Sequence, residues 1–268
     1  MSRFTVLGSS GFIGRNLVAH LRQQGHEVLT PVRDTNLAGL ELGSLIYAIG
    51  LTGDFRQRPL DAVDAHVGML GRVLREAHFD SFLYLSSTRV YGGIPADQLA
   101  HEELTLPQSP TSDGLYDLSK LLGEAMCLVQ DNPAVRVVRL SNVYGQGQSP
   151  YTFLQMLIDS LVRDGRVTIG EAVDSAKDYV ALSDVVEILP QIALRGRARL
   201  YNLASGHSVS HGELVMRLRE LTGGHIVFAA NAFSRRFPRI DVSRLGQEFE
   251  WQPRALLTDL PTLLNTAE

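Results

Sequence analysis

The chain has 268 residues, of which 44% are hydrophobic and 20% charged, with one cysteine and a formal net charge of −4. This composition is that of a globular protein, and it excludes disordered and collagen-like chains; the mild acidity argues against nucleic-acid binding. The lone Cys127 excludes an internal disulfide framework, and no apolar run approaches the ~20 residues of a membrane span, so we expect a cytoplasmic protein without a secretory leader.

The first half of the chain alternates short apolar runs with amphipathic stretches. In chain order, the pattern predicts a strand at 4–7, a helix at 12–25, strands at 27–32 and 45–49, a helix at 61–77, a strand at 82–85, a helix at 115–130 and a strand at 135–140. Pro31 is awkward in a central strand because it lacks an N–H. Near-continuous apolar strands between helices indicate an α/β fold with a doubly wound parallel sheet. The stretch 33–45 is too short for a full crossover, so we expect one strand–helix pair to be reduced there.

The second half is less regular, and it predicts a small α/β lobe. We expect a helix at 151–163 and a strand at 167–169. Ser183 is the expected N-cap of a helix that Pro190 should kink or end. Ser210 and Glu213 form a capping-box pattern that opens a helix at 214–221. The predicted division is therefore 1–145 and 146–268, with the two parts interleaved.

A glycine-rich turn follows the first predicted strand, as Gly8-x-x-Gly11-x-x-Gly14. In a strand–turn–helix context, Gly8 allows a tight turn, Gly11 lets the backbone approach a pyrophosphate, and Gly14 lets helix and strand pack closely. The helix N-terminus would offer free N–H groups to phosphates. This pattern predicts a Rossmann-like dinucleotide-binding domain at 1–145; the alternative is a merely tight turn. The neighbours expected to line the cofactor are Ser10, Phe12 and Ile13.

The end of the second predicted strand bears on the choice of dinucleotide. It reads Val32-Arg33-Asp34, so a basic and an acidic residue are adjacent. An acidic residue there accepts from the ribose 2′-hydroxyl of NAD, whereas an arginine suits the 2′-phosphate of NADP. Because Arg33 falls at the strand end, the sequence leans slightly to NADP. The alternative, that Arg33 only covers the adenine, suits either cofactor, so the sequence implies NAD(P).

Candidate catalytic residues occur on a predicted helix and after a predicted strand. Tyr116 and Lys120 are four residues apart, on one helix face, where an ammonium would lower the phenol pKa. Tyr116 could then exchange a proton with a substrate, and Lys120 could hold the nicotinamide ribose. Ser87 and Thr88 follow the strand at 82–85, where ligands bind in open α/β sheets. The alternatives are an ordinary amphipathic helix edge and hydroxyls that only cap the strand.

With these pieces assembled, the sequence resembles the extended short-chain dehydrogenase/reductase family, in its NAD-dependent nucleotide-sugar epimerase/dehydratase branch. The motifs that carry the resemblance are the glycine turn, Ser86-Ser87-Thr88-Arg89-Val90-Tyr91-Gly92, Tyr116-x-x-x-Lys120, Arg139-Leu140-Ser141-Asn142-Val143-Tyr144-Gly145, Lys177-Asp178-Tyr179-Val180 and Tyr201-Asn202-Leu203-Ala204-Ser205-Gly206. The resemblance implies that Tyr116 relays a proton, that Lys120 lowers its pKa and binds the cofactor ribose, and that Ser87 is the hydroxyl partner. It also implies that Ala48, Ile49 and Gly50 line the adenosine side of the cofactor.

The resemblance further implies a substrate site in the second half of the chain, which makes 146–268 a substrate-binding lobe. Asn142 would contact the sugar nucleotide, and Lys177 stands where relatives place a basic residue that meets the diphosphate. Arg235 and Arg236 could supply a guanidinium that Lys177 lacks. The alternative for these three charged side chains is a solvated surface.

Two departures from the family pattern matter. Sugar-nucleotide 4,6-dehydratases follow the active-site hydroxyl with an Asp-Glu pair, but this chain has Thr88-Arg89. Arginine cannot act as that base, so dehydration is disfavoured. His66 lies where relatives often present asparagine, and we expect it to be a polar residue of the helix face without a role.

We therefore expect an NAD(P)-dependent epimerase of a nucleoside-diphosphate sugar that works through a transient keto intermediate. The close alternative is an NADPH-dependent reductase of a nucleotide-linked ketosugar, and the second alternative is a non-catalytic dinucleotide-binding sensor or scaffold. No metal is expected. A homodimer would use the helix at 61–77 and the helix that bears Tyr116. The sugar and its nucleotide are open.

Overall fold

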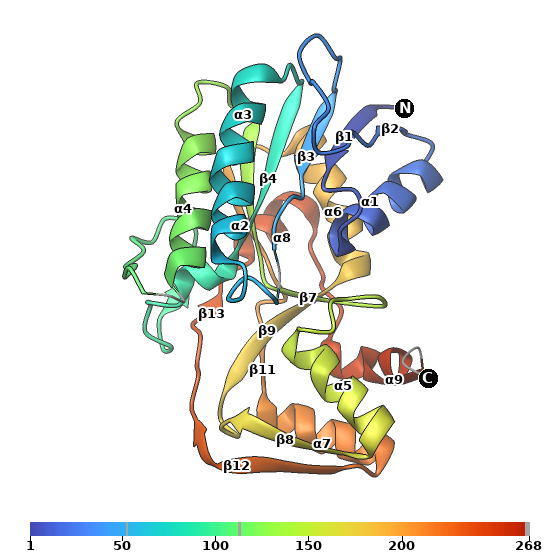
Figure 1. Ribbon diagram of the computed structural model, residues 1–268, viewed down its shortest axis with the longest axis vertical. Coiled ribbons are helices and arrows are strands. Elements are labelled where there is room, and N and C mark those ends of the chain that lie inside the picture. Colours follow the sequence, from blue (N-terminus) through green and yellow to red (C-terminus); the bar gives the residue numbers. More distant parts are fainter. Residues whose placement is uncertain (52, 112–113, 266–268) are drawn as a thin grey trace.

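The computed structural model describes residues 1–51, 53–111 and 114–265, and it contains a central parallel sheet with a smaller lobe beside it (Figure 1). The described strands of this sheet run in the order β2–β1–β3–β4–β6–β10, and their pairings are parallel. They are β1 (Arg3–Leu7), β2 (Glu27–Leu29), β3 (Ser44–Tyr47), β4 (Ser81–Ser87), β6 (Val135–Leu140) and β10 (Leu200–Leu203). This sheet confirms the predicted doubly wound α/β fold.

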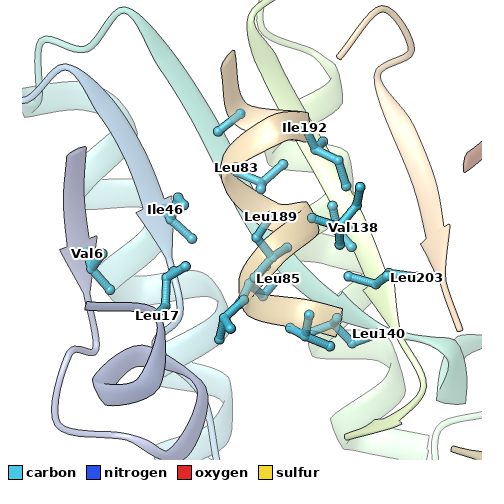
Figure 2. Close-up of a cluster of buried hydrophobic side chains, with 14 of the residues drawn as sticks. Val6, Leu17, Ile46, Leu83, Leu85, Val138, Leu140, Leu189, Ile192 and Leu203 are labelled. Carbon is cyan, nitrogen blue, oxygen red and sulfur yellow. The ribbon is translucent and has the colours of Figure 1, made fainter. Parts of the chain in front are cut away.

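Helices cover both faces of the central sheet. One face packs against α1 (Phe12–Gln23) and α6 (Leu182–Arg195), and Figure 2 shows the apolar side chains between them. The labelled residues of that core are Val6, Leu17, Ile46, Leu83, Leu85, Val138, Leu140, Leu189, Ile192 and Leu203. The other face packs against α3 (Met69–Glu76) and α4 (Gly114–Leu128). The inner strands β3, β4 and β6 are therefore buried on two sides, which is why their sequences are almost continuously apolar, whereas the edge strand β2 is partly exposed.

The smaller lobe lies at the carboxyl ends of the central strands, below them in Figure 1. Its strands are β7 (Asn142–Tyr144), β8 (Arg166–Glu171), β9 (Ala176–Ala181), β11 (Ser208–Ser210) and β12 (His225–Phe233). Its helices are α5 (Phe153–Asp164), α7 (His211–Thr222) and α9 (Leu256–Asn265), which share an apolar core of their own. Between β9 and β11 the chain returns to the central sheet to form α6 and β10. Residues after 145 therefore contribute to both parts.

Short elements complete the described fold. They are η2 (Thr88–Tyr91), a 3₁₀ turn after β4; β5 (Leu99–Ala100) paired with β13 (Arg239–Ile240); and α8 (Ser243–Phe249), which packs on β10. A capping box at Ser210 and Glu213 opens α7, as the sequence predicts. No helix in the described ranges combines the length and apolar character that a bilayer crossing needs.

Several element bounds differ from those predicted. Strand β2 ends at Leu29 instead of residue 32, because Pro31 cannot donate to a sheet ladder. Residues 30–43 carry no helix, which confirms the reduced strand–helix pair. The helix expected at 61–77 consists of α2 (Pro59–Val63), a π-helical turn η1 (Asp64–Gly68) and α3. The helix expected at 115–130 is α4, and the helix expected at 151–163 begins at Phe153 as α5.

The expected N-cap of α6 is wrong, and Pro190 does not end this helix. Ala181 precedes the first turn, and Ser183 lies inside the helix with its hydroxyl against Asp184. The helix also continues past Pro190 to Arg195. Ile188, Leu189, Ile192 and Ala193 flank this proline and are buried against the sheet, so packing outweighs the lost backbone hydrogen bond.

Candidate active site

The glycine turn joins β1 to α1 at the carboxyl end of the sheet. Gly8 has a φ of +83°, and a Cβ there would lie 2.7 Å from the Ala48 backbone beyond β3. A Cβ on Gly14 would lie 2.1 Å from the Gly8 carbonyl oxygen. Glycine is thus required at both positions, because the strand, the turn and the first turn of the helix leave no room for a side chain.

The N-terminus of α1 is open to a cavity of about 450 Å³. Its N-cap is Gly11, no side chain accepts from its first N–H groups, and its first turn carries no acidic residue. Free N–H groups at a helix N-terminus favour an anion such as a pyrophosphate. The predicted cofactor residues that line this cavity are Gly8, Ser10, Gly11, Arg33, Ala48, Ile49 and Gly50. This cradle fits a dinucleotide.

Two arginines meet at the outer end of this cavity. Arg33 lies four residues beyond β2, in the turn that follows, and its side chain is exposed. Arg72 of α3 also lines the cavity, and its Nη2 donates to the Arg33 carbonyl oxygen at 3.2 Å. Arg72 could not be predicted from the sequence, because an arginine on an exposed helix face carries no signal of what the fold places opposite it.

A second cavity, also about 450 Å³, lies between the central sheet and the smaller lobe. It shares Gly11, Ala48, Ile49 and Gly50 with the first, so the two are continuous along the strand ends. Its lining includes Phe12 and Ile13 from α1. It also includes the four predicted catalytic residues Ser87, Thr88, Tyr116 and Lys120. Gly14 lines neither cavity, and its place in the structure is the contact between α1 and β1.

Helix α4 holds the catalytic pair against the sheet. A buried ion pair between Glu124 of α4 and Arg139 of β6, at 2.6 Å, fixes the helix to the strand. Lys120 is 5% exposed, and its Nζ donates to the Leu85 carbonyl oxygen at 2.8 Å. The Tyr116 side chain, 8% exposed, hydrogen-bonds the Ser87 side chain. The structure therefore brings the predicted Ser–Tyr–Lys group together at the carboxyl end of β4.

The charges around Tyr116 differ from those the sequence predicts. Burial raises the pKa of Tyr116 to about 12, and the cation that acts in the opposite direction is Arg89. The Lys120 Nζ lies 6.0 Å from the ring centre. Burial also lowers the pKa of Lys120 to about 7. We expected Lys120 to lower the pKa of Tyr116, but in the structure the cation that does so is Arg89.

Arg89 and a loop after β3 enclose the phenol. Arg89 binds the Asp117 carboxylate through Nε at 3.1 Å and Nη2 at 3.3 Å. Its guanidinium lies over the rings of Phe55 and Tyr116, at 5.1 and 5.5 Å from their centres. Phe55 is itself 4.4 Å from the Tyr116 ring and brings Arg56 to the cavity. The sequence did not predict this enclosure, because nothing local to the loop indicates a contact with α4.

Two of the predicted substrate residues, Asn142 and Lys177, line the second cavity and already have partners within the protein. Asn142 Nδ2 donates to the Asp178 carbonyl oxygen at 2.7 Å, and the side chain lines the second cavity. Lys177 lines it as well, with Nζ 3.1 Å from Glu171 and 4.0 Å from the Phe153 ring centre. Burial lowers the pKa of Lys177. Lys177 is thus already paired with an anion.

The two arginines after β12, Arg235 and Arg236, lie in different surroundings. Arg235 lines the second cavity. Arg236 instead pairs with Asp174 on the exposed surface and is absent from the described cavity lining. The expectation that both guanidiniums face the substrate therefore fits the position of Arg235 but not that of Arg236.

His66 is not the polar helix-face residue that the sequence suggests. It lies in the π-helical turn η1 and is fully buried. Its Nδ1 is 2.9 Å from the Ser119 Oγ, and its ring meets the Tyr116 ring edge-on at 5.1 Å. The prediction failed because a π turn rotates residues out of the register that a regular helix gives.

Comparisons with known proteins agree with this architecture. Residues 4–204 match the NAD dependent epimerase/dehydratase family. The GDP-6-deoxy-D-mannose reductase of Pseudomonas aeruginosa is 29% identical, over 96% of each chain. A dTDP-glucose 4,6-dehydratase of Streptomyces griseus is 30% identical over 67% of this chain, which spans only 56% of that protein.

Solved structures show the same fold. The structure of RMD from Pseudomonas aeruginosa complexed with NADPH has a TM-score of 0.85 at 24% identity, covering 100% of this chain and 99% of the other. MoeE5 in complex with UDP-glucose and NAD has a TM-score of 0.81 at 24% identity, covering 98% of each chain.

Proposed function

The chain belongs to the NAD dependent epimerase/dehydratase family, and we propose that it is an NADPH-dependent reductase of a nucleotide-linked ketosugar. One observation carries the proposal: the Tyr116 phenol hydrogen-bonds the Ser87 side chain in the second cavity, which is continuous with the first. Reduction of a carbonyl needs an acid at its oxygen, and a phenol with a pKa of about 12 is protonated at neutral pH. The full-length reductase relative from Pseudomonas aeruginosa supports the same reaction class.

Two arginines in the lining of the first cavity favour NADPH over NADH as the cofactor. Arg33 and Arg72 place two cations where the chain could meet a 2′-phosphate. The glycine turn and the open N-terminus of α1 would hold the pyrophosphate. The RMD structure complexed with NADPH has the same fold, which supports this choice.

The residues of the site then divide the reaction among them. A bound dinucleotide supplies the hydride. Tyr116 donates its phenolic proton to the carbonyl oxygen of the substrate, and Ser87 hydrogen-bonds the same oxygen and orients it. Lys120 holds a ribose hydroxyl, and Arg89 is the cation near the phenolate that Tyr116 becomes. Phe55 covers the ring of Tyr116 and keeps water from it.

The smaller lobe would bind the nucleotide part of the substrate. Asn142, Lys177 and Arg235 line the second cavity, and Arg56 faces it from the loop after β3. Because three cationic side chains, Arg56, Lys177 and Arg235, line this one cavity, we propose that together they meet the diphosphate. Arg236 has no place in this proposal.

The described side chains that line the second cavity do not support dehydration. Arg89 stands after Thr88, bound to Asp117, and a guanidinium offers no base. Among the described residues that line the second cavity, the carboxylates are Glu171, paired with Lys177, and Asp178, which accepts from Ser205 N and Oγ. Both are committed to other partners.

Epimerisation is the second candidate, since Tyr116 and Ser87 can take a proton from a sugar hydroxyl as well as give one. A UDP-glucuronic acid 4-epimerase from Bacillus cereus has the same fold, with a TM-score of 0.81 at 18% identity. The two candidates differ in stoichiometry: a reductase consumes one reduced dinucleotide for each product, whereas an epimerase consumes none.

The test is a panel of nucleoside-diphosphate sugars and ketosugars with NAD, NADH, NADP and NADPH. Absorbance would follow the cofactor, and NMR would identify the product. We expect stoichiometric loss of NADPH with a nucleotide ketosugar. A new epimer without net cofactor change would favour epimerisation, and dinucleotide binding without any product would favour the non-catalytic sensor or scaffold. We also expect a cytoplasmic location and a homodimer formed through α4 and the helices at 59–76.

A further inference from the structure

The wall of the second cavity in the smaller lobe contains a chain of three ionisable side chains. Glu171, at the end of β8, lies between Lys177 of β9 and His211 of α7. Its Oε2 is 3.1 Å from Lys177 Nζ and 3.6 Å from His211 Nε2. Lys177 and Glu171 line the cavity, whereas His211 is 1% exposed and does not line it. A carboxylate thus links a cation at the cavity wall to a buried imidazole.

Phe153 of α5 contacts both ends of this chain. Its ring stacks on the His211 ring, with the centres 4.3 Å apart and an angle of 16° between the planes. The Lys177 Nζ lies 4.0 Å from the centre of the same ring. One aromatic side chain therefore holds the ammonium and the imidazole in place around Glu171.

The His211 ring has unused capacity for a proton. Neither Nδ1 nor Nε2 has a hydrogen-bond partner among the described residues. Burial, and next Lys177, lower the pKa of His211 to about 4, while Glu171 acts in the opposite direction. The ring is therefore neutral at pH 7, and it can take up a proton without giving up a hydrogen bond.

The other charged groups around His211 have partners elsewhere or act through Lys177. Glu213, on the same helix, accepts from Ser210 N and Oγ. Burial lowers the pKa of Lys177, and Arg235 beyond β12 adds to this effect but does not shift the pKa of His211. The charge next to His211 is therefore set by Glu171 and Lys177.

A diphosphate at the cavity wall would compete with Glu171 for the Lys177 ammonium. Its oxygens carry two negative charges, and they would share the N–H donors of the cation that Glu171 now holds. A buried carboxylate that loses its counter-ion is strongly destabilised, and an added anion nearby raises the proton affinity of neighbouring bases. His211 is a neutral base within 3.6 Å of Glu171. It is therefore placed to supply the missing positive charge.

We propose that His211 is a positioning residue of the substrate site: when a diphosphate engages Lys177, His211 takes a proton from solvent and becomes the second cation beside Glu171. This inference rests on the proposed binding of a nucleotide-linked substrate in the smaller lobe. Binding is then accompanied by the uptake of one proton and weakens as the pH rises. His211 does not touch the ligand, because it acts through Glu171 and Lys177.

The first test is titration calorimetry with UDP-glucose, dTDP-glucose and GDP-mannose as probes, in buffers of different ionisation enthalpy. A phosphate monoester has a second pKa of about 6, but the diphosphate of these probes is esterified at both ends and has no such group. Any proton taken up near that pH therefore belongs to the protein. We expect uptake of up to one proton, and a Kd that rises by up to about tenfold per pH unit.

The second test identifies the proton acceptor by NMR of the ring nitrogens in protein with ¹⁵N-labelled histidine. The His211 signal is assigned by its absence in His211→Gln or His211→Phe. At about pH 6 we expect a neutral ring in the free protein and a protonated ring in the complex. His66, which is buried and lines neither cavity, should stay neutral in both.

These two measurements separate failure of the inference from failure of the proposed function. Binding without proton uptake, or uptake while His211 stays neutral, overturns the inference and leaves the proposed function standing. If none of the three probes binds, the proposed nucleotide binding fails and the inference fails with it.

The third test removes each partner in turn. Glu171→Gln removes the charge that His211 balances, so binding should take up no proton although His211 is still present. His211→Gln should also abolish the uptake and make the Kd independent of pH. His207→Gln removes an exposed imidazole just before β11 and is the matched control, with the behaviour of the wild type. Proton uptake that persists in Glu171→Gln would contradict the inference, and the wild-type signals decide even if a variant fails to fold.

Discussion

The guanidinium of Arg89 lies 5.5 Å from the centre of the Tyr116 ring while it binds both carboxylate oxygens of Asp117. The phenol therefore faces a cation and its counter-anion together. Arg89 lowers the pKa of Tyr116 and Asp117 raises it, and both act on a group whose pKa burial has already raised to about 12. The pair sets how readily the proton leaves Tyr116.

Changing each member of this pair should move the pH profile in opposite directions. Because Tyr116 must be protonated to act as an acid, activity is lost as pH rises through its pKa. Asp117→Asn removes the charge that raises this pKa, so the alkaline loss of kcat/KM should occur at lower pH than in the wild type. Arg89→Gln should shift it to higher pH. If the pH profiles of both variants equal that of the wild type, neither charge affects the pKa of Tyr116.

Removing the phenolic hydroxyl tests the catalytic assignment directly. Tyr116→Phe should lower turnover at least ~10²-fold, the typical contribution of a positioned acid–base group, with little change in the melting temperature. Tyr201→Phe is a suitable control, because it removes a hydroxyl that contacts Glu248, away from both cavities. Unchanged turnover in Tyr116→Phe would sink the role of Tyr116 in proton transfer.

How far the sequence predicts this site depends on the range of each interaction. The glycine turn, and Tyr116 with Lys120 one helical turn apart, are local patterns, so their spacing alone predicts where they lie. The parallel sheet follows in the same way from apolar runs between amphipathic stretches. These features need no knowledge of what packs against them.

The features that the sequence missed all depend on contacts between distant segments. Arg72 meets Arg33 across 39 residues, and Phe55 reaches Tyr116 across 61. His66 was assigned to a polar helix face because a π turn leaves no clear mark in the pattern of apolar residues. Burial was the missing information for His66, and it also reverses the expected shift of the Tyr116 pKa.

Lys120 should make stability depend on pH. Its folded-state pKa, about 7, is below the ordinary 10.5, so between these values the unfolded chain binds more protons and stability rises with pH. Lys120→Met removes this effect. The free energy of unfolding of the wild type relative to Lys120→Met should rise between pH 7 and 10, with a slope of up to about 1.4 kcal/mol per pH unit. Urea unfolding across this range measures it, and a constant difference would contradict a buried titrating lysine.

The two arginines at the outer end of the first cavity should select for NADPH. Arg33→Ala and Arg72→Ala should each weaken NADPH binding about tenfold, as expected for loss of a charge-assisted contact, and should leave NADH nearly unaffected. Titration calorimetry with both dinucleotides gives the ratio. Arg75→Ala is the control, since Arg75 lies on the same helix outside the cavity lining. An equal loss for NADPH and NADH would mean that these arginines contact no 2′-phosphate.

The close approach of α1 to β1 can be separated from helix propensity by two glycine substitutions. A Cβ on Gly14 would lie 2.1 Å from the Gly8 carbonyl oxygen, so Gly14→Ala should force the helix from the strand and lower the free energy of unfolding by roughly 1–3 kcal/mol. Gly246 also lies in a helix, α8, but nothing is within 4 Å of its Cβ position. Gly246→Ala should therefore raise the free energy of unfolding by about 0.5–1 kcal/mol through helix propensity. Denaturant unfolding compares the two, and a stabilised Gly14→Ala would show that the turn tolerates a side chain and that the cradle of the pyrophosphate is looser than its contacts indicate.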